Sequence, residues 1–279
     1  MFNKRHIVRT IAATVSILAL SFTAACGSGQ STASNSTDSD DITQQTYKPG
    51  KLTIATGQPA YEPWVMNDKP ESGEGYEAAV AYAVADKLGF KKSDVVWTRT
   101  AFDTAIAPGA KDWDFNIQQF GITDERKKAV DFSSSYYNDS QSVVVKKDSK
   151  FANATKVSDL KDATVGVMVG TLAYDYAKAN IKDDIQTFND DAALAQALDA
   201  GQIDVLVTST VECVYMVQSE QVKDSKVLGR LPDSEDKSGM GIVLPKDSKL
   251  TAAVTKAVDD LNADGTIKKL QDKWLAEYT

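Results

Sequence analysis

Two hydrophobic periods alternate along the chain. Residues 51–56 alternate apolar and polar side chains as a half-buried strand does, and residues 76–88 place apolar side chains at the i, i+3, i+4 spacing of a helix. A strand at residues 95–97, a short helix at 102–106 and a strand at 115–117 follow. This β-α-β-α-β order predicts a mostly parallel sheet with helices on its faces.

A second series of the same kind occupies the rest of the chain. Further predicted strands are residues 142–145, 164–168, 204–207 and 239–244, and further predicted helices are residues 171–179, 190–201, 250–261 and 267–274. Two such series predict two lobes. Since ligands of parallel sheets bind beyond the carboxyl ends of the strands, we expect residues 57–64 and 119–126 to converge on a binding site.

The first 25 residues have the three-part pattern of a secretory signal peptide. Basic residues near the start precede an apolar run over residues 11–22, which is too short for a spanning helix, and the small-residue sequence Thr23-Ala24-Ala25. Cys26 follows directly, and Ala-Ala-Cys resembles a bacterial lipobox, with an ordinary secretory signal and a chance Cys as the alternative. We therefore predict a signal peptide over 1–25 and a lipidated N-terminus with a flexible polar tether over 26–50.

Composition narrows the function further. At 279 residues, of which 42% are hydrophobic, the chain can form one large or two small cores. The formal net charge is −8, and loss of a basic signal peptide makes the chain more acidic still, which argues against nucleic acid as a partner. The only histidine, His6, lies in the signal peptide, so no His-based metal site, Ser–His triad or cofactor is predicted. Cys213 is then a lone cysteine, expected as a buried small hydrophobe.

The densest chemistry lies in residues 114–137. Thr123 stands where a helix N-cap should be, with acidic residues next to it in the first turn, and Arg126 is a cation in that same turn. A guanidinium beside uncapped backbone N–H groups makes an anion site that matches a carboxylate. The alternative is a solvated Arg on a short surface helix.

The segment from Ile122 to Ser133, followed by Tyr136-Tyr137, resembles the signature of the family 3 extracellular solute-binding proteins. These are the polar amino-acid receptors of bacterial ABC importers, and glutamine-binding proteins share the pattern. The resemblance extends more weakly from about Lys51 to the C-terminus. It implies an α/β, two-lobed type II periplasmic-binding-protein fold with a two-segment hinge.

The implied lobes divide the chain unevenly. Lobe 1 is expected over residues 51–139 plus 233–279, and lobe 2 is the insertion over 140–232. The two hinge segments are then residues 137–140 and 231–233, and closure around a ligand is a hinge motion.

The resemblance also implies which residues bind the ligand. Arg126 pairs with the α-carboxylate, aromatic residues flank the ligand side chain, and a Gly-Thr turn presents backbone amides. Ordinary core packing is the alternative for each aromatic. The expected site residues are Tyr61, Trp64, Phe102, Gln119, Gly121, Thr123, Arg126, Met168, Gly170, Thr171, Leu172, Ser209 and Glu212.

The chain departs from the family pattern at the amine end of the site. The sequence Gln119-Phe120-Gly121 lacks a hydroxyl that helps hold the ammonium, although a carbonyl and an N–H remain, and Met168 replaces a Lys or Gln. Ser209 stands where relatives carry the Asp that pairs with the ammonium. Glu212 is the candidate substitute if Thr210 caps a helix there, and the alternative is that Glu212 only complements the helix dipole.

These features predict the substrate-binding component of an ABC importer. It would capture an amino acid or related small carboxylate, close, and deliver it to a permease with its cytoplasmic ATPase. We expect a monomer outside the cytoplasm, anchored to the membrane by lipid and without catalytic activity. One alternative is an enzyme of the same fold, such as a cyclohexadienyl dehydratase using Glu212 or Glu77, or the regulatory lobe of a lytic transglycosylase. The other is a solute sensor.

Overall fold

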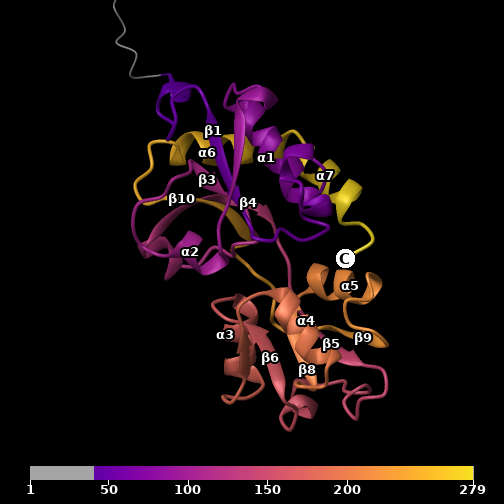
Figure 1. The fold of residues 1–279 in the computed structure, drawn as a ribbon. Helices are drawn as coiled ribbons and strands as arrows, with labels where there is room; N and C mark the ends of the chain where they lie inside the picture. The colour runs from indigo at the N-terminus through magenta and orange to yellow at the C-terminus, as the bar shows by residue number, and fades with distance from the viewer. Residues whose placement is uncertain (1–40, 279) are drawn as a thin grey trace, which may run out of the picture. The chain divides into compact units, whose positions relative to one another are not determined.

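The structure is a computed structural model that describes residues 41–278. Its strands form two five-stranded sheets. The first sheet has the order β2-β1-β3-β10-β4, from β1 (Leu52–Thr56), β2 (Val95–Arg99), β3 (Phe115–Asn116), β4 (Val130–Tyr137) and β10 (Met240–Pro245). Figure 1 shows β10, from late in the chain, beside strands from its first half. Because β10 is antiparallel to β3 and β4 while β1 is parallel to β2 and β3, the prediction of a mostly parallel sheet is confirmed with β10 as the exception.

Helices cover this sheet where the hydrophobic period predicts them. They are α1 (Tyr76–Lys87), α2 (Phe102–Ile106), α6 (Thr251–Ala263) and α7 (Thr266–Trp274), with short 3-10 turns at Ile42–Gln44, Met66–Asp68, Pro70–Ser72, Lys92–Asp94 and Arg126–Lys128. The apolar face of α1 contributes Val80 and Val84 to a core shared with Ile54 of β1 and Val258 of α6. This packing leaves the strand ends and their loops free to form a site.

The second sheet repeats the arrangement. Its order is β7-β6-β8-β5-β9, from β5 (Gln141–Lys146), β6 (Val165–Met168), β7 (Gln186–Phe188), β8 (Val205–Ser209) and β9 (Ser225–Arg230). Its helices are α3 (Leu172–Asn180), α4 (Asp191–Asp199) and α5 (Thr210–Gln218), and a 3-10 turn covers Val157–Leu160. The strand period distributes β5 between two cores, because Val143 and Val145 pack on one face and Val144 on the other.

The sequence pattern does not predict three of the observed strands, namely β4, β7 and β9. In β4 the serines at 133–135 interrupt the apolar alternation, and the first two residues of β7 are exposed. β9 lies at a sheet edge and ends in an exposed Gly-Arg pair. Neighbouring strands supply the hydrogen bonds that these weakly patterned segments need, so local sequence carries little signal for them.

The chain passes between the sheets twice, over residues 138–140 and 231–239. The Asp236 amide donates to the Asp139 carbonyl at 2.9 Å, so the two crossing segments are tied to each other. The Leu231 amide also donates to the carbonyl of Gln141, the first residue of β5, at 2.8 Å. The signal peptide and Cys26 lie outside the described residues, so their predictions stay open.

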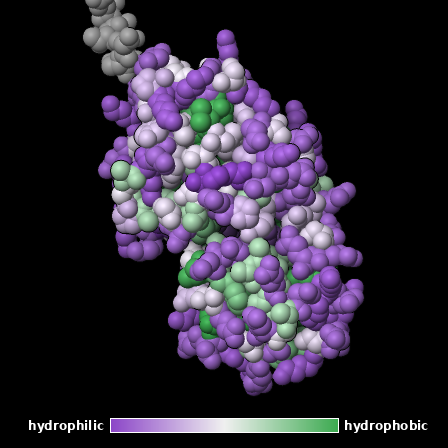
Figure 2. All heavy atoms as spheres, in the orientation of Figure 1, coloured by the Kyte–Doolittle hydropathy of each residue, from purple (hydrophilic) through white to green (hydrophobic). Residues whose placement is uncertain are grey.

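Few large apolar side chains are exposed among residues 41–278, namely Tyr47, Val96 and Val169. On the face in Figure 2, hydrophilic residues dominate and hydrophobic residues form small separate patches. Within residues 41–278, no helix combines the length and apolar character needed to span a membrane.

Candidate functional site

A cavity of about 240 Å³ lies where loops at the strand ends of the two sheets meet. The loop after β1 and the segment after β3 both contribute to its wall, as predicted for residues 57–64 and 119–126. Of the expected site residues, those that line the cavity are Tyr61, Phe102, Gln119, Gly121, Arg126, Met168, Thr171, Leu172, Ser209 and Glu212.

Trp64, Thr123 and Gly170 were expected in the site but are absent from the cavity wall. Each instead holds a residue that lines it. The Trp64 indole Nε1 donates to Glu212 Oε2 at 3.0 Å, and Thr123 Oγ1 accepts from the Arg126 amide at 3.1 Å. The Gly170 carbonyl accepts from Arg126 Nη2 at 2.7 Å. These three residues therefore support the site without forming its surface.

Arg126 is the cation of the cavity wall. Its Nη1 donates to the Gly121 carbonyl at 2.7 Å while its Nη2 bonds Gly170, so one guanidinium joins segments that belong to the two sheets. Its guanidinium carbon lies 5.5 Å from the centre of the Phe102 ring. Burial lowers the pKa of Arg126, and the charges of nearby aspartates oppose that shift.

The expected helix after Thr123 is wrong. The segment forms a three-residue 3-10 turn, Arg126–Lys128, because the chain enters β4 at Val130. The anion-binding capacity of this segment therefore comes from the guanidinium and not from a helix N-terminus. An α-helix N-terminus does occur beside the second sheet, at the start of α3. Thr171 caps this helix by accepting from the Tyr174 amide at 3.2 Å.

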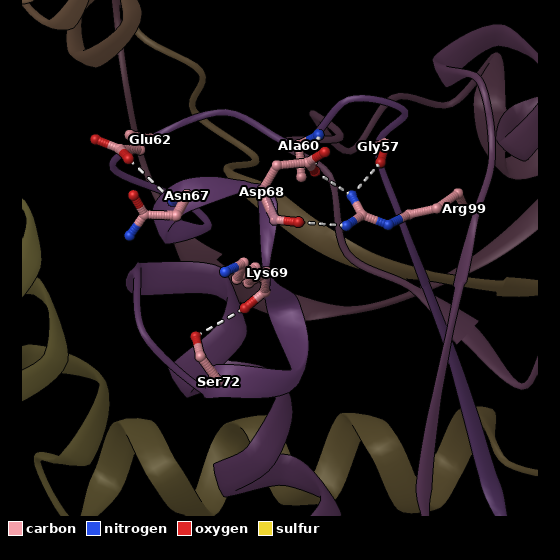
Figure 3. A network of polar contacts seen from close by, with 8 residues as sticks. All are labelled: Gly57, Ala60, Glu62, Asn67, Asp68, Lys69, Ser72 and Arg99. Atoms are coloured by element: carbon pink, nitrogen blue, oxygen red, sulfur yellow. Dashed lines mark hydrogen bonds and ion pairs between the residues drawn. The ribbon is translucent and has the colours of Figure 1, made fainter.

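The loop after β1 is held by an ion-pair network that sequence reasoning missed. Figure 3 shows Arg99, at the end of β2, pointing to the Gly57 carbonyl and to Asp68. Arg99 Nη1 lies 2.9 Å from the Gly57 oxygen, and Asp68 Oδ1 also accepts from the Ala60 amide at 3.0 Å. Gly57 and Ala60 line the cavity, so this network positions its wall.

Gln119 owes its conformation to a buried carboxyl group. Its backbone has φ 52°, a region that non-glycine residues rarely adopt. The Glu77 carboxylate accepts from the Gln119 amide at 2.7 Å, from the Gln119 side chain and from the Tyr136 hydroxyl. Burial raises the pKa of Glu77 to about 7. Glu77, which the enzyme alternative named as a catalytic candidate, lies outside the cavity wall.

Glu212 lines the cavity from the first turn of α5 and is only 4% exposed. The N-cap of α5 is Ser209, whose hydroxyl accepts from the Glu212 amide at 3.3 Å. The expectation that Thr210 is the cap is wrong, because its hydroxyl donates to the Ser140 carbonyl at 2.9 Å. Burial, followed by the charge of Asp191, raises the pKa of Glu212 well above its usual range.

Asp191 is a site residue that the sequence did not single out. It is the first residue of α4 and lines the cavity beside Asp190, whose side chain caps that helix by accepting from the Ala193 amide at 2.8 Å. Burial and the charge of Asp190 raise the pKa of Asp191 to about 6. Acidic residues at a helix start are ordinary because they suit its N-terminus, so the sequence pattern gives Asp191 no separate functional signal.

Other chemistry is limited. Within residues 41–278, no group of His, Cys, Asp and Glu side chains is arranged to hold a metal ion. Cys213 is a free, fully buried thiol, as predicted.

Comparison with known proteins identifies the fold and the family. The L-cystine-binding protein TcyJ of Escherichia coli (strain K12) is 30% identical over 217 residues, covering 77% of this chain and 79% of that protein. The structure of an ancestral arginine-binding protein bound to arginine matches with 31% identity and a TM-score of 0.68, covering 81% of this chain and 98% of the other. An ancestral amino acid-binding protein, AncCDT-1, described as a precursor of cyclohexadienyl dehydratase, matches with 30% identity and a TM-score of 0.67, covering 81% and 95%.

These relatives are two-lobed binding proteins of the type II periplasmic fold, and the two sheets described above form the same α/β architecture. Residues 52–277 match the family described as bacterial extracellular solute-binding proteins, family 3. The chain belongs to the family 3 extracellular solute-binding proteins, whose relatives here bind amino acids.

Proposed function

We propose that this protein is the substrate-binding component of an ABC importer. It captures an amino acid in the cavity by lobe closure and delivers it to a permease that works with a cytoplasmic ATPase. The observation that carries the proposal is the position of the Arg126 guanidinium in the cavity wall. It donates to the Gly121 carbonyl, which follows a strand of the first sheet, and to the Gly170 carbonyl, which follows a strand of the second. A guanidinium so placed can grip an α-carboxylate in bidentate fashion and couple that contact to closure.

The lobes in this proposal are residues 51–139 plus 233–279 and residues 140–232. The crossing segments 138–140 and 231–239 supply the hinge, and Arg126 supplies the carboxylate contact. The relatives' names direct the choice of ligand, because the similar proteins bind cystine and arginine. Those two amino acids are the first to test.

A thermal-shift screen with the twenty amino acids, cystine, small peptides and simple carboxylates tests the binding step. We expect one or a few amino acids to raise the melting temperature, and calorimetry then gives the affinity. If only carboxylates without an amine bind, the amino-acid assignment is wrong. Turnover of a cyclohexadienyl substrate by the purified protein would favour the dehydratase alternative instead.

Delivery needs a separate test. Cells that express the parent chain should accumulate the radiolabelled ligand faster than cells without it, and loss of the permease should abolish the difference. A sensor would bind the same ligand but leave uptake unchanged.

The proposal includes an extracytoplasmic location, attachment through lipid on Cys26 and a monomeric state. It predicts that Cys26→Ser releases the processed protein into the soluble fraction. Retention of that variant in membranes washed with high salt and carbonate would place the anchor elsewhere. Sedimentation equilibrium of the soluble variant measures the oligomeric state.

A further inference from the structure

Four buried oxygen atoms in the cavity wall have no hydrogen-bond partner among the described residues. They are Tyr61 Oη, Gln118 Oε1, Asp191 Oδ1 and Glu212 Oε1. The amide oxygen and any ionised carboxylate oxygen can only accept, and a buried acceptor is costly unless a donor reaches it. The cavity wall is therefore suited to a ligand group that carries several N–H donors.

Three of these atoms belong to ionisable side chains from three different elements. Tyr61 comes from the loop after β1, Asp191 from the start of α4 and Glu212 from the first turn of α5. Their side chains line the same cavity, and burial, followed by the charges of Asp190, Asp191 and Glu212, raises the pKa of Tyr61. The backbone N–H of Ala192 is also near the Tyr61 hydroxyl, but it does not reach hydrogen-bond geometry.

The other oxygen of Glu212 is engaged by the protein, since Glu212 Oε2 accepts from the Trp64 indole at 3.0 Å. The Thr208 side chain lowers the pKa of Asp191 and so favours its ionised form. The free oxygens of both carboxylates are thus left for the cavity. A primary ammonium has three N–H donors, which matches the Tyr61, Asp191 and Glu212 oxygens one to one.

We propose that Tyr61, Asp191 and Glu212 form the amine subsite, and that the ligand ammonium displaces a proton that the two carboxyl groups share in the ligand-free protein. This inference rests on the proposed binding of an amino acid. Two carboxylates in a water-poor site cannot both ionise easily, so one proton stays with the pair. The arriving ammonium replaces that positive charge, both carboxyl groups ionise, and the proton leaves to solvent.

The surroundings of the pair favour retention of the proton. Asp190 faces Asp191, and Asp139 and Glu77 add negative charge near Glu212. Among the described residues that line the cavity, Arg126 is the one cation, and its guanidinium is bonded to backbone carbonyls. Because acidic groups outnumber cations here, the carboxyl pair favours a bound positive charge, either a proton or the ligand ammonium.

This subsite also accounts for the missing aspartate at Ser209. The Ser209 hydroxyl caps α5 and thereby orders the first turn that presents Glu212. In this chain Glu212 and Asp191 take the place of the ammonium-pairing Asp that relatives carry at position 209. They reach the cavity from two different helices.

Calorimetry at pH 5, below the pKa expected for the pair, in two buffers of different ionisation enthalpy counts the protons exchanged on binding. With the best amino acid from the screen, we expect the parent to release about one proton per ligand, and its affinity to fall about tenfold per pH unit below the pKa of the pair. Asp191→Asn and Glu212→Gln should bind without proton release. Asp183→Asn, an exposed control, should behave as the parent.

Tyr61→Phe tests the Tyr61 hydroxyl, the third hydrogen-bond acceptor, independently of the proton held by the two carboxyl groups. It should keep the proton release but weaken binding several-fold. A parent that binds an amino acid with no proton exchange overturns the inference, as does either carboxamide variant that still releases a proton.

The shared proton can also be tested without any ligand. In carboxyl-labelled protein, nuclear magnetic resonance should show Asp191 and Glu212 titrating together near or above pH 6, and each single variant should return the remaining group to a lower pKa. Independent titration of both groups below pH 5 overturns the inference. Failure of every amino acid to bind would instead overturn the proposed function, and this titration would still decide the shared proton.

Discussion

The indole of Trp64 and the carboxylate of Glu212 are 148 residues apart in the chain and joined by a hydrogen bond of 3.0 Å. Trp64 is 1% exposed, and its ring packs against Tyr76 and Tyr137 with centroids 6.0 Å and 5.6 Å away. The aromatic cluster therefore fixes the indole, and the indole fixes one oxygen of Glu212. The other oxygen remains available to the cavity.

Trp64→Phe should retain much of the ring packing but leave Glu212 without this donor. Because a buried acceptor loses its partner, we expect a loss of about 1–3 kcal/mol in the free energy of unfolding, with weaker amino-acid binding. The pKa of Glu212 should rise further, since this bond lowers it. Urea unfolding and calorimetry measure the two effects.

Trp97→Phe is the matched control for this change. Its indole donates to the Tyr82 hydroxyl at 3.1 Å, outside the cavity wall, so it removes an indole hydrogen bond without touching a carboxylate. Equal losses of ligand affinity in the two variants would contradict a specific role for Trp64.

Arg126→Ala should abolish or severely weaken ligand binding. Loss of a partly desolvated charge pair with the ligand carboxylate should cost roughly 2–5 kcal/mol of binding free energy. Arg126→Lys should restore only part of it, because an ammonium cannot form the two-pronged contact. Calorimetry against the identified ligand measures this, with the exposed neighbour variant Lys127→Ala as control. Unchanged affinity in Arg126→Ala would remove this residue from the site.

Gly121→Ala should weaken binding because the cavity wall is tightly packed at this position. A Cβ there would lie 2.5 Å from Leu172 Cδ1 and 2.8 Å from Asp236 Oδ2. Leu172 belongs to α3, which packs on the second sheet, so the added methyl group must displace the Leu172 and Asp236 side chains at the cavity wall. We expect a loss of about 1–3 kcal/mol in binding free energy, typical of overpacking.

A second substitution tests that cause. Leu172→Ala should recover part of the affinity lost in Gly121→Ala, and a double-mutant cycle by calorimetry measures the coupling. Additive effects in the cycle would mean that the two side chains do not clash.

Glu77 should make folding stability depend on pH. Its folded-state pKa of about 7 lies above its ordinary value of 4.5, so the folded protein binds the proton more tightly than the unfolded chain. The resulting stabilisation is fully present below the ordinary value and is lost as the pH rises through about 7. Between pH 5 and 8 this group should remove about 2–3 kcal/mol from the free energy of unfolding.

Glu77→Gln removes the titration while keeping an acceptor for the Gln119 amide. Urea unfolding of parent and variant at pH 5 and pH 8 isolates the contribution of Glu77, because the remaining carboxyl groups titrate in both proteins. Identical pH profiles would contradict the assigned pKa shift.

The repeating elements of the fold could be predicted from the sequence, because strand and helix periods record burial against a neighbouring face and that burial is local to each segment. The periods of residues 51–56 and 76–88 correspond to β1 and α1, and Thr171 and Asp190 cap helices where their side chains favour it. The edge strand β7 has no such signal, since its pairing comes from β6 and not from its own pattern.

The position of Arg126 could be anticipated because it stands in an ordered motif. The sequence indicated Glu212 as a candidate but not what holds it. Asp191, Trp64 and the Glu77–Gln119 contact acquired their roles only in the tertiary structure. Whether a carboxyl group caps a helix, supports a loop or faces a cavity depends on which distant segments pack beside it. Only folding sets the burial and charge that determine the carboxyl group's pKa.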